Sequence, residues 1–216
     1  MNALNKILRF LFYAIIVRIV VMIVLGLNVR HSEKLPTKGP AIIVANHNSH
    51  LDTMVLMSLL PLRLLPDIQP VAAMDYFLRN PLLAWFALKI IGILPLKRKP
   101  DYRGEDILSP VYNALQDERI LIFFPEGSRG QPEKLSSFKS GLAKIAQQHP
   151  DIPVVPIMLH GLGKSLPKGE ALLVPFFCDV FVGDAFKWTG SRTSFMKQLE
   201  QRMASLSEEG QFPPWE

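Results

Sequence analysis

Short apolar runs alternate with amphipathic stretches along most of this chain, after an N-terminal segment that is apolar almost throughout. Runs such as AIIVA at residues 41–45 and RILIFF at 119–124 have the length and composition of buried strands. The stretches between them carry apolar residues three and four positions apart, which is typical of helices. Strands are expected at residues 41–45, 69–73, 91–96, 119–124, 154–159 and 172–182, and helices at 52–60, 81–90, 105–116, 140–148 and 193–206.

This alternation predicts an α/β fold, with a mixed, mostly parallel sheet flanked by helices. A chain of 216 residues can bury one such core. We assign the main domain to residues 41–209, a polar linker with proline and glycine to 31–40, and an irregular tail to 210–216. Ligand sites in open α/β sheets lie just past the carboxyl ends of the strands, so functional residues are expected there.

Residues 1–30 form a separate, strongly apolar segment. Between residues 7 and 27 only Arg9 and Arg18 interrupt the apolar sequence, and about 20 apolar residues suffice to cross a bilayer as a helix. A charge such as Arg18 near the middle costs about 2.5–3.5 kcal/mol there. We therefore expect a membrane-associating helical segment that crosses the bilayer, forms a hairpin, or lies in one leaflet with its arginines at headgroup level. A helix buried in the protein core is the alternative.

The charge and cysteine content narrow the choice of partners and compartment. A net charge of +5 suits anionic lipid headgroups or phosphorylated substrates. Nucleic acid is not an expected partner, because the chain shows no recognition helix, zinc pattern or aromatic-studded basic strand. The single cysteine, Cys178, excludes an internal disulfide and suits a reducing compartment. Together with the apolar segment, this favours a location at a membrane, on the cytoplasmic face of the inner membrane.

The first group of candidate residues is the sequence NHNSHLD at residues 46–52, directly after the AIIVA strand. His47 can accept a proton from an alcohol near neutral pH, and a carboxylate such as Asp52 would orient its ring. Taken alone, the pattern also fits a turn histidine followed by a helix-capping aspartate. A metal site of His47, His50 and Asp52 has no further ligand nearby, so no metal is expected. A nucleophilic Ser49 would lack the G-x-S-x-G turn.

A second group follows the RILIFF strand as FPEGSRG, residues 124–130. A glycine turn lets backbone amides approach a substrate, and this places Gly127 and Ser128 at the candidate site. Arg129 offers a planar, permanently charged group that suits a phosphate. Glu126 could hydrogen-bond hydroxyl groups of a substrate or hold the loop. The alternative is an ordinary turn with a surface arginine.

Two further stretches complete the set. GILPLKR at residues 92–98 ends in cations that include Arg98. These cations form either an anion-binding site or a solvated basic edge. IPVVPI at residues 152–157, which contains Pro156, is too apolar for chemistry and is expected to shape a pocket wall or line an acyl groove.

In this order and spacing, the four stretches resemble the four-block signature of the glycerolipid acyltransferase family, typified by 1-acylglycerol-3-phosphate acyltransferases. The resemblance covers about residues 41–157. It implies that His47 is the general base, oriented by Asp52, and that the activated hydroxyl attacks the thioester of acyl-CoA or acyl-carrier protein with no acyl-enzyme. The acceptor would be a lysophospholipid, foremost 1-acylglycerol-3-phosphate, which gives phosphatidic acid. Beyond this co-substrate no metal, prosthetic group or other cofactor is implied.

The resemblance also assigns the remaining site residues. Arg98 and Arg129 would hold the acceptor's phosphate, and Glu126, Gly127 and Ser128 would shape that pocket. Asn46, Ser49 and Pro156 would support it, and an N-terminal helical hairpin that sits in one leaflet in some relatives matches residues 7–27.

The sequence departs from the family pattern at one position. Many members carry an A-K-x-E-L-like stretch whose lysine lies near the phosphate, whereas this chain has VAAMDYF at residues 71–77, with Ala73 in place of the lysine. Another lysophospholipid or an aminolipid therefore stays open as the acceptor. Two other functions also stay open: a non-catalytic peripheral membrane protein that binds anionic lipids, and a hydrolase of acyl thioesters that uses the same His–Asp pair.

Overall fold

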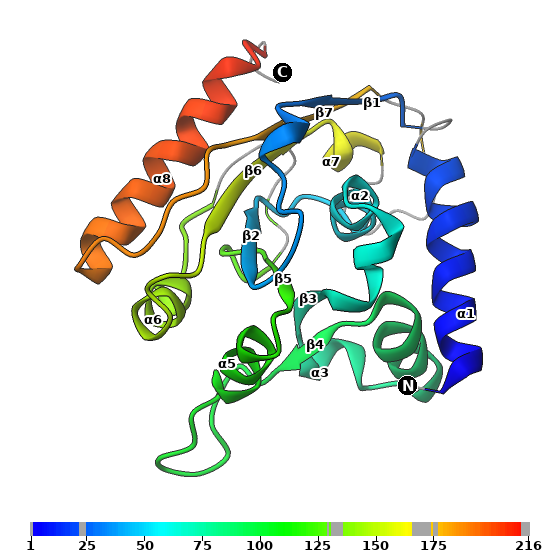
Figure 1. Ribbon diagram of the computed structural model, residues 1–216, viewed down its shortest axis with the longest axis horizontal. Helices are drawn as coiled ribbons and strands as arrows, with labels where there is room; N and C mark the ends of the chain where they lie inside the picture. The colour runs from blue at the N-terminus through cyan, green and yellow to red at the C-terminus, as the bar shows by residue number, and fades with distance from the viewer. Residues whose placement is uncertain are drawn as a thin grey trace.

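A computed structural model of the chain describes residues 2–21, 25–128, 130, 136–165, 174 and 177–212. Its centre is a seven-stranded sheet in the order β1-β7-β6-β2-β5-β3-β4 (Figure 1). The strands are β1 (Leu27–Arg30), β2 (Ala41–Ala45), β3 (Ile68–Ala73), β4 (Leu94–Leu96), β5 (Ile120–Phe123), β6 (Val154–His160) and β7 (Cys178–Val182). The main helices are α1 (Ala3–Leu11), α2 (Leu51–Leu59), α3 (Met74–Phe77), α4 (Pro81–Trp85), α5 (Ser109–Gln116), α6 (Gly141–Gln148), α7 (Leu162–Ser165) and α8 (Arg192–Glu209).

The pairing within this sheet is parallel except at one place. β2 runs parallel to β5 and β6, β3 runs parallel to β5 and β4, and β1 runs parallel to β7. Among the described strands only β6 and β7 pair antiparallel. This confirms the predicted mixed, mostly parallel α/β fold.

Helices cover both faces of the sheet, and the strand residues alternate between the two cores. Along β2, Ala41, Ile43 and Ala45 join the core that contains α2 and the N-terminal helix. Ile42 and Val44 face the opposite core, which contains α5, α6 and α8. Figure 1 shows these two groups of helices on opposite sides of the sheet. Because successive strand residues point to opposite faces, a strand covered on both sides is apolar throughout, as AIIVA is.

The N-terminal helix packs against the domain along one face and exposes apolar side chains on the other. α1 continues into the π-helical turn η1 (Phe12–Val17), and its buried face includes Arg9, Tyr13 and Val17, spaced four residues apart. Arg9 donates from Nη2 to the carbonyl oxygen of Ile68 at 2.9 Å, so it points into the protein and away from the surface on which headgroups could lie. Within the described part of the chain, no helix has both the length and the apolar character needed to cross a bilayer.

Strand β1 lies inside the segment that we expected to be an anchor. Leu27–Arg30 pairs with β7, and Asn28 donates to a carboxylate oxygen of Asp179 at 2.8 Å. Four residues with alternating exposure give too short a pattern to read as a strand, so the sheet begins earlier than residue 41.

Of the strand predicted at 172–182, β7 covers Cys178–Val182, and residues 172, 173, 175 and 176 lie outside the described residues. Two other elements are shorter than predicted for a clear local reason. β4 begins only at Leu94, because Gly92 adopts a left-handed conformation, with φ of 79°, that ends the preceding helical turn η5 (Phe86–Ile91). α5 begins only at Ser109, followed by Pro110, which favours the first helical turn since it has no amide hydrogen to donate.

Candidate active site

The residues predicted to be functional follow four parallel strands at the same edge of the sheet. The NHNSHLD loop follows β2, the FPEGSRG loop follows β5, α3 follows β3, and Arg98 follows β4. These strands are neighbours in the sheet order β2-β5-β3-β4 and run in the same direction. Their carboxyl ends therefore share one edge, as expected for the ligand side of an open α/β sheet.

His47 and Asp52 meet at this edge. His47 Nδ1 lies 2.9 Å from Asp52 Oδ2, and the same oxygen accepts the backbone N–H groups of Asn48 at 2.7 Å and Ser49 at 2.8 Å. Asp52 is fully buried in the first turn of α2, while the His47 side chain keeps 19% of its surface exposed. Because Nδ1 is bound to the aspartate, Nε2 is the ring nitrogen that can accept a proton from a substrate.

The surroundings of Asp52 shift the pKa of its carboxyl group in two opposite directions. Burial raises the pKa of Asp52 above its ordinary value, and the hydrogen bond from His47 and the two backbone N–H groups oppose this rise. The second carboxylate oxygen, Oδ1, is buried without a hydrogen-bond partner among the described residues. Asp52 therefore holds the imidazole through Oδ2, the same oxygen that accepts the two backbone N–H groups.

The FPEGSRG loop holds the backbone of His47 from both sides. Glu126 Oε1 accepts the N–H of His47 at 2.9 Å, and the N–H of Gly130 donates to the carbonyl oxygen of His47 at 3.0 Å. The ring of Phe124 stacks on the His47 imidazole with centroids 4.1 Å apart. These contacts fix the imidazole between the aspartate and an aromatic face. Neither the stacking nor the backbone bonds could be inferred from the motif.

Only one of the two carboxylate oxygens of Glu126 takes part in the hydrogen bond to the His47 backbone. Glu126 is 5% exposed, and burial raises the pKa of its carboxyl group above the ordinary value, while hydrogen bonds from His47 and Ser136 oppose this rise. Its Oε2 is buried and has no partner within the described ranges. A hydroxyl group of a bound molecule or a water would satisfy this oxygen, which belongs to the carboxylate that binds the backbone of His47.

Gly127 is required by its conformation and by a neighbouring side chain. Its φ is +73°, and a Cβ at this position would meet the Lys139 side chain, with Nζ at 2.5 Å. Lys139 is tied to the same loop, since its N–H donates to the carbonyl oxygen of Pro125 at 2.9 Å. Lys139 was not among the residues predicted to be functional. Its only signal is the FKSG sequence before α6, which carries a cation at the helix entrance.

Substituting Gly127 by alanine is expected to reduce both the stability of the protein and its activity. The left-handed backbone alone costs about 1–2 kcal/mol for a residue with a Cβ, and the added methyl also pushes the end of the Lys139 side chain away from Gly127. Gly190→Ala is the matched control, because its φ is +85° and nothing lies within 4 Å of a Cβ there. Thermal denaturation and initial rates should show a similar backbone cost in both variants and an activity loss only in Gly127→Ala. Equal activity in the two variants would contradict this assignment.

The predicted supporting residues occupy three different environments. Asn46 donates to the carbonyl oxygen of Leu159 at 2.8 Å and accepts the N–H of Leu159 at 2.7 Å, which joins the end of β2 to β6. Ser49 accepts the N–H of Leu51 at 3.2 Å and helps to shape the turn into α2. Pro156 lies in the core within β6, where it packs closely against Gly183. Ser128 is exposed, and Arg129 lies outside the described residues.

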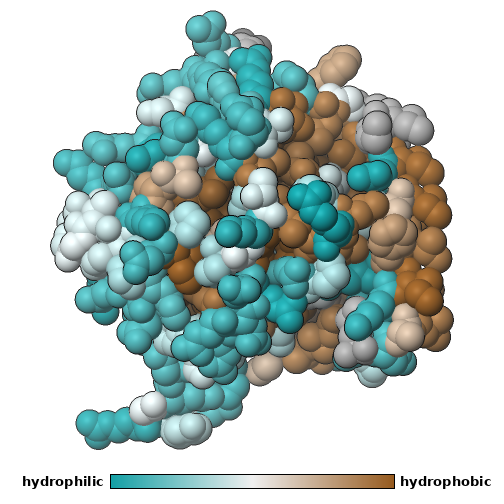
Figure 2. Space-filling model, in the orientation of Figure 1, coloured by the Kyte–Doolittle hydropathy of each residue, from teal (hydrophilic) through white to brown (hydrophobic). Residues whose placement is uncertain are grey.

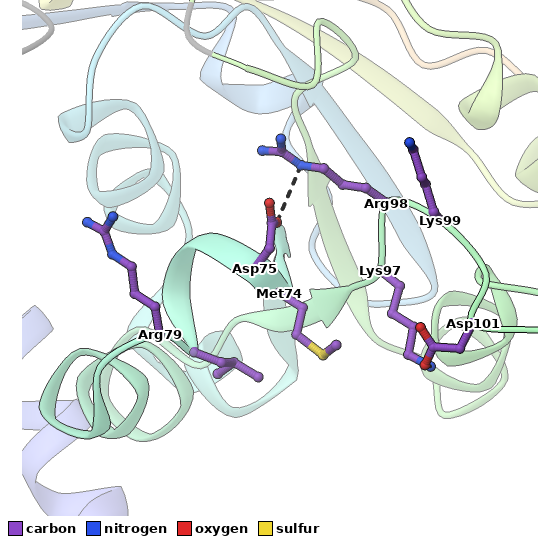
Figure 3. Close-up of a pocket in the computed structure, with 8 residues that line it drawn as sticks. Met74, Asp75, Arg79, Lys97, Arg98, Lys99 and Asp101 are labelled. Carbon is purple, nitrogen blue, oxygen red and sulfur yellow. Dashed lines mark hydrogen bonds and ion pairs between the residues drawn. The ribbon is translucent and has the colours of Figure 1, made fainter.

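Arg98 lines a cationic cavity at the ends of β3 and β4 (Figure 3). The cavity has a volume of about 580 Å³, and its charged lining consists of Asp75, Arg79, Lys97, Arg98, Lys99 and Asp101. Lys97 is held by Asp101 and Glu105, each at 2.6 Å. Figure 3 shows Arg98 and Lys99 pointing away from that cluster. Arg98 makes a 3.4 Å contact with Asp75, in which both side chains are more than half exposed, so a bound anion can compete for the guanidinium.

This cavity is connected to the loop that carries the base. The ring of His50 stacks on Tyr76 of α3 with centroids 6.4 Å apart, and the guanidinium of Arg79 lies 4.8 Å above the same tyrosine ring. The structure thus brings Arg98 to the same edge of the sheet as His47, with β5 and β3 between the strands that carry them. Across the ranges that the structure describes, no group of three or more potential metal ligands is present.

A histidine oriented by a buried aspartate, with a cationic cavity at the same carboxyl edge of the α/β sheet, has the features of a general-base site for an anionic substrate. The family model described as Acyltransferase matches residues 26–160, which include every one of these groups. The chain belongs to the acyltransferase family.

Individual relatives agree with this membership. The chain is 34% identical to the chloroplastic 1-acyl-sn-glycerol-3-phosphate acyltransferase of Arabidopsis thaliana over 145 residues, which are 67% of this chain and 38% of that protein. It is 30% identical to the human 1-acyl-sn-glycerol-3-phosphate acyltransferase alpha over 156 residues, 71% of this chain and 52% of that protein. The chain therefore matches about half or less of the length of these curated relatives.

A solved structure shares the fold. The crystal structure of the 1-acyl-sn-glycerophosphate acyltransferase PlsC from Thermotoga maritima superposes with a TM-score of 0.73 at 21% identity, covering 98% of this chain and 81% of that one. At this level of identity the likeness concerns the architecture. It agrees with the mixed sheet and its flanking helices described above.

Proposed function

We propose that the protein is an O-acyltransferase that moves a fatty acyl group from acyl-CoA or acyl-carrier protein to the free hydroxyl of 1-acylglycerol-3-phosphate, giving phosphatidic acid. The observation that carries the proposal is the 2.9 Å bond between His47 Nδ1 and the buried Asp52. The names of the relatives in plants and animals support the acceptor and the reaction.

The proposed reaction begins at Nε2, the ring nitrogen of His47 that is not bound to Asp52. Nε2 of His47 takes the proton of the acceptor hydroxyl as its oxygen attacks the thioester carbonyl carbon, and Asp52 stabilises the imidazolium that forms. The tetrahedral intermediate then collapses, the carbon–sulfur bond breaks, and the leaving thiolate receives the proton from the imidazolium. The product is an ester and a free thiol, so the reaction needs no metal or prosthetic group.

The cationic cavity is the proposed site of the acceptor's phosphate. Arg98 offers a planar fork to phosphate oxygens, and Lys99 and Arg79 line the same space. These two cations support Arg98 in a pocket that lacks the family's lysine at the position of Ala73. Glu126 Oε2, which is buried without a partner in the described structure, would accept a hydrogen bond from the acceptor.

The proposed location is a membrane surface, with the domain on the cytoplasmic face of the inner membrane. The outward face of α1 and η1 exposes Leu4, Ile7, Ile15 and Ile16, each at 50% or more. Figure 2 shows the resulting brown surface along the side formed by α1. The net charge of +5 and the buried, reduced Cys178 suit a cytoplasmic leaflet with anionic lipids.

The proposal is tested by offering a panel of acceptors together with labelled acyl-CoA or acyl-carrier protein and measuring the lipid products by mass spectrometry. The expected result is phosphatidic acid from 1-acylglycerol-3-phosphate. A preference for another lysophospholipid or an aminolipid would change the acceptor. Free fatty acid formed without any acceptor would identify a hydrolase, and no turnover of any donor would point to a lipid-binding protein.

Substituting Arg98 by glutamine is expected to weaken use of the phosphorylated acceptor while sparing the donor. A hydrogen bond to a charged group is worth about 1.5–3 kcal/mol, so kcat/KM for the acceptor should fall about 10- to 100-fold. The measurement is initial rate against acceptor concentration and, separately, against acyl-CoA concentration. Arg103→Gln, an exposed cation of the following loop, is the matched control and should leave both parameters unchanged. An equal loss in the two variants would mean that only net charge matters.

A further inference from the structure

Helix α4 places two large apolar side chains outside the protein, next to the N-terminal helix. Leu82 is 79% exposed and Trp85, three residues later on the same face, is 43% exposed. Single exposed apolar residues are ordinary on protein surfaces, but contiguous apolar patches mark interaction sites. Leu82 and Trp85 therefore matter only if they continue a larger apolar surface.

α4 runs directly into η5, and η5 packs against α1, so Leu82 and Trp85 lie on the helix next to the apolar face of α1. The rings of Phe12 and Phe86 meet edge to face with centroids 5.4 Å apart, and the Arg9 guanidinium packs closely over Gly92 at the end of η5. Ala87 and Ile90 face inward. The two helices thus use their inner faces to hold each other, and both have apolar side chains left on their outer faces. In Figure 2 the brown surface covers the α1 side of the molecule.

Beside α4, the apolar surface gives way to cations. Leu78 and Arg79 lie between α3 and α4; both line the cationic cavity, and Arg79 is exposed one residue before Asn80, whose side chain caps α4. An apolar surface bordered by arginine matches a lipid leaflet, where acyl chains lie beneath anionic headgroups. Tryptophan is also a residue that favours the boundary between acyl chains and headgroups.

We propose that Leu82 and Trp85 of α4 form a second lipid contact, separate from the N-terminal helix, that enters one leaflet of an anionic phospholipid bilayer. With lipid contacts on two neighbouring helices, the domain cannot rotate about the axis of the N-terminal helix as it lies on the membrane. A single helix would leave this rotation free. In this orientation the cavity of Arg79 and Arg98 lies at headgroup level. The inference rests on the proposed function in one respect: the acceptor is a lipid whose acyl chain stays in the leaflet while its phosphate enters the cavity.

The direct test uses the position of Trp85 relative to the acyl chains. The chain has three tryptophans, so the full-length Trp188→Phe, Trp215→Phe variant leaves Trp85 as the only one. This protein is mixed with vesicles of phosphatidylcholine and phosphatidylglycerol, with or without bromine atoms on the acyl chains. Bound protein is measured by sedimentation, and fluorescence is compared between the two vesicle types. We expect brominated chains to quench at least half of the Trp85 emission.

A second measurement separates lipid contact from catalysis. Leu82→Glu is expected to weaken vesicle binding about tenfold and to slow transfer to a vesicle-embedded acceptor, with unchanged transfer to a water-soluble short-chain acceptor that has the same headgroup. Ala204→Glu, which adds the same charge at an exposed position of α8 on the other side of the sheet, is the matched control and should bind as the wild type does.

The quenching result does not depend on activity, so it stands even if the protein proves not to acylate lysophosphatidate. Vesicle-bound protein whose Trp85 emission is unaffected by bromine would overturn the proposal, as would a failure of the protein to bind vesicles. Equal binding of Leu82→Glu and wild type would overturn it as well.

Discussion

Replacement of His47 by alanine is expected to lower acyl transfer about 10²–10⁴-fold, the range that general-base catalysis contributes. The substitution removes Nε2, the only proton acceptor that the described site presents between Asp52 and the open edge of the sheet. The ring is partly exposed and packs on one face against Phe124, so its loss should leave the fold intact. Initial rates with purified protein, labelled acyl-CoA and 1-acylglycerol-3-phosphate measure the effect.

His50→Ala is the control for this experiment. His50 lies on the same loop but is exposed, and its ring faces Tyr76 rather than Asp52. The control should fold as the wild type does and retain most of its turnover. Near-normal turnover of His47→Ala would rule out the proposed mechanism.

Replacement of Asp52 by asparagine should reduce transfer almost as strongly. An asparagine can donate from Nδ2 to His47 Nδ1, which forces the ring proton onto Nε2 and removes the lone pair that must accept the substrate's proton. In a Ser-His-Asp triad the same change costs about 10⁴-fold, and we expect a loss of about 10²–10⁴-fold here. The loss should appear in kcat, because Asp52 is fully buried and does not contact the acceptor. A variant changed only in KM would contradict the orienting role.

The same variant has a defined effect on the pH dependence of stability. Burial raises the folded-state pKa of Asp52 above its ordinary value of 3.8. A raised pKa favours folding below the ordinary value, and this contribution is lost as the pH rises through the folded-state pKa. The asparagine side chain of the variant does not titrate, so the stability of the variant relative to wild type should increase as the pH rises above about 4, by roughly 1.4 kcal/mol for each pH unit of pKa difference. Thermal denaturation across this range measures it, and a relative stability that falls with pH would contradict it.

Much of the fold followed from hydrophobic patterning. AIIVA and RILIFF are apolar in every or almost every position because β2 and β5 are covered on both faces, and such runs are recognisable in a single sequence. Strand β1 was not predicted because its four residues are half exposed and gain their structure from pairing with β7, about 150 residues later. The buried Arg9 was also missed, since only the tertiary structure supplies the carbonyl of Ile68 as its partner.

As with the fold, the local contact of the site was predicted from the sequence and the long-range contacts were not. The short spacing from His47 to Asp52 predicts a local contact between their side chains, and the structure contains that contact. The contacts that hold His47 in place come from residues about 80 positions away, as with Glu126 and Phe124, and Lys139 reaches the loop from the start of another helix. Such contacts depend on the order of the strands in the sheet, which the motifs do not encode.

The central claim is that an imidazole and a buried carboxylate act as one proton-accepting unit. A double-mutant cycle tests it, with kcat measured for wild type, His47→Ala, Asp52→Asn and the combined variant under identical conditions. If Asp52 acts only through His47, the combined variant should be no slower than His47→Ala alone, because the aspartate has nothing left to orient. Losses that multiply in the combined variant would show that the two residues act independently and would contradict the account.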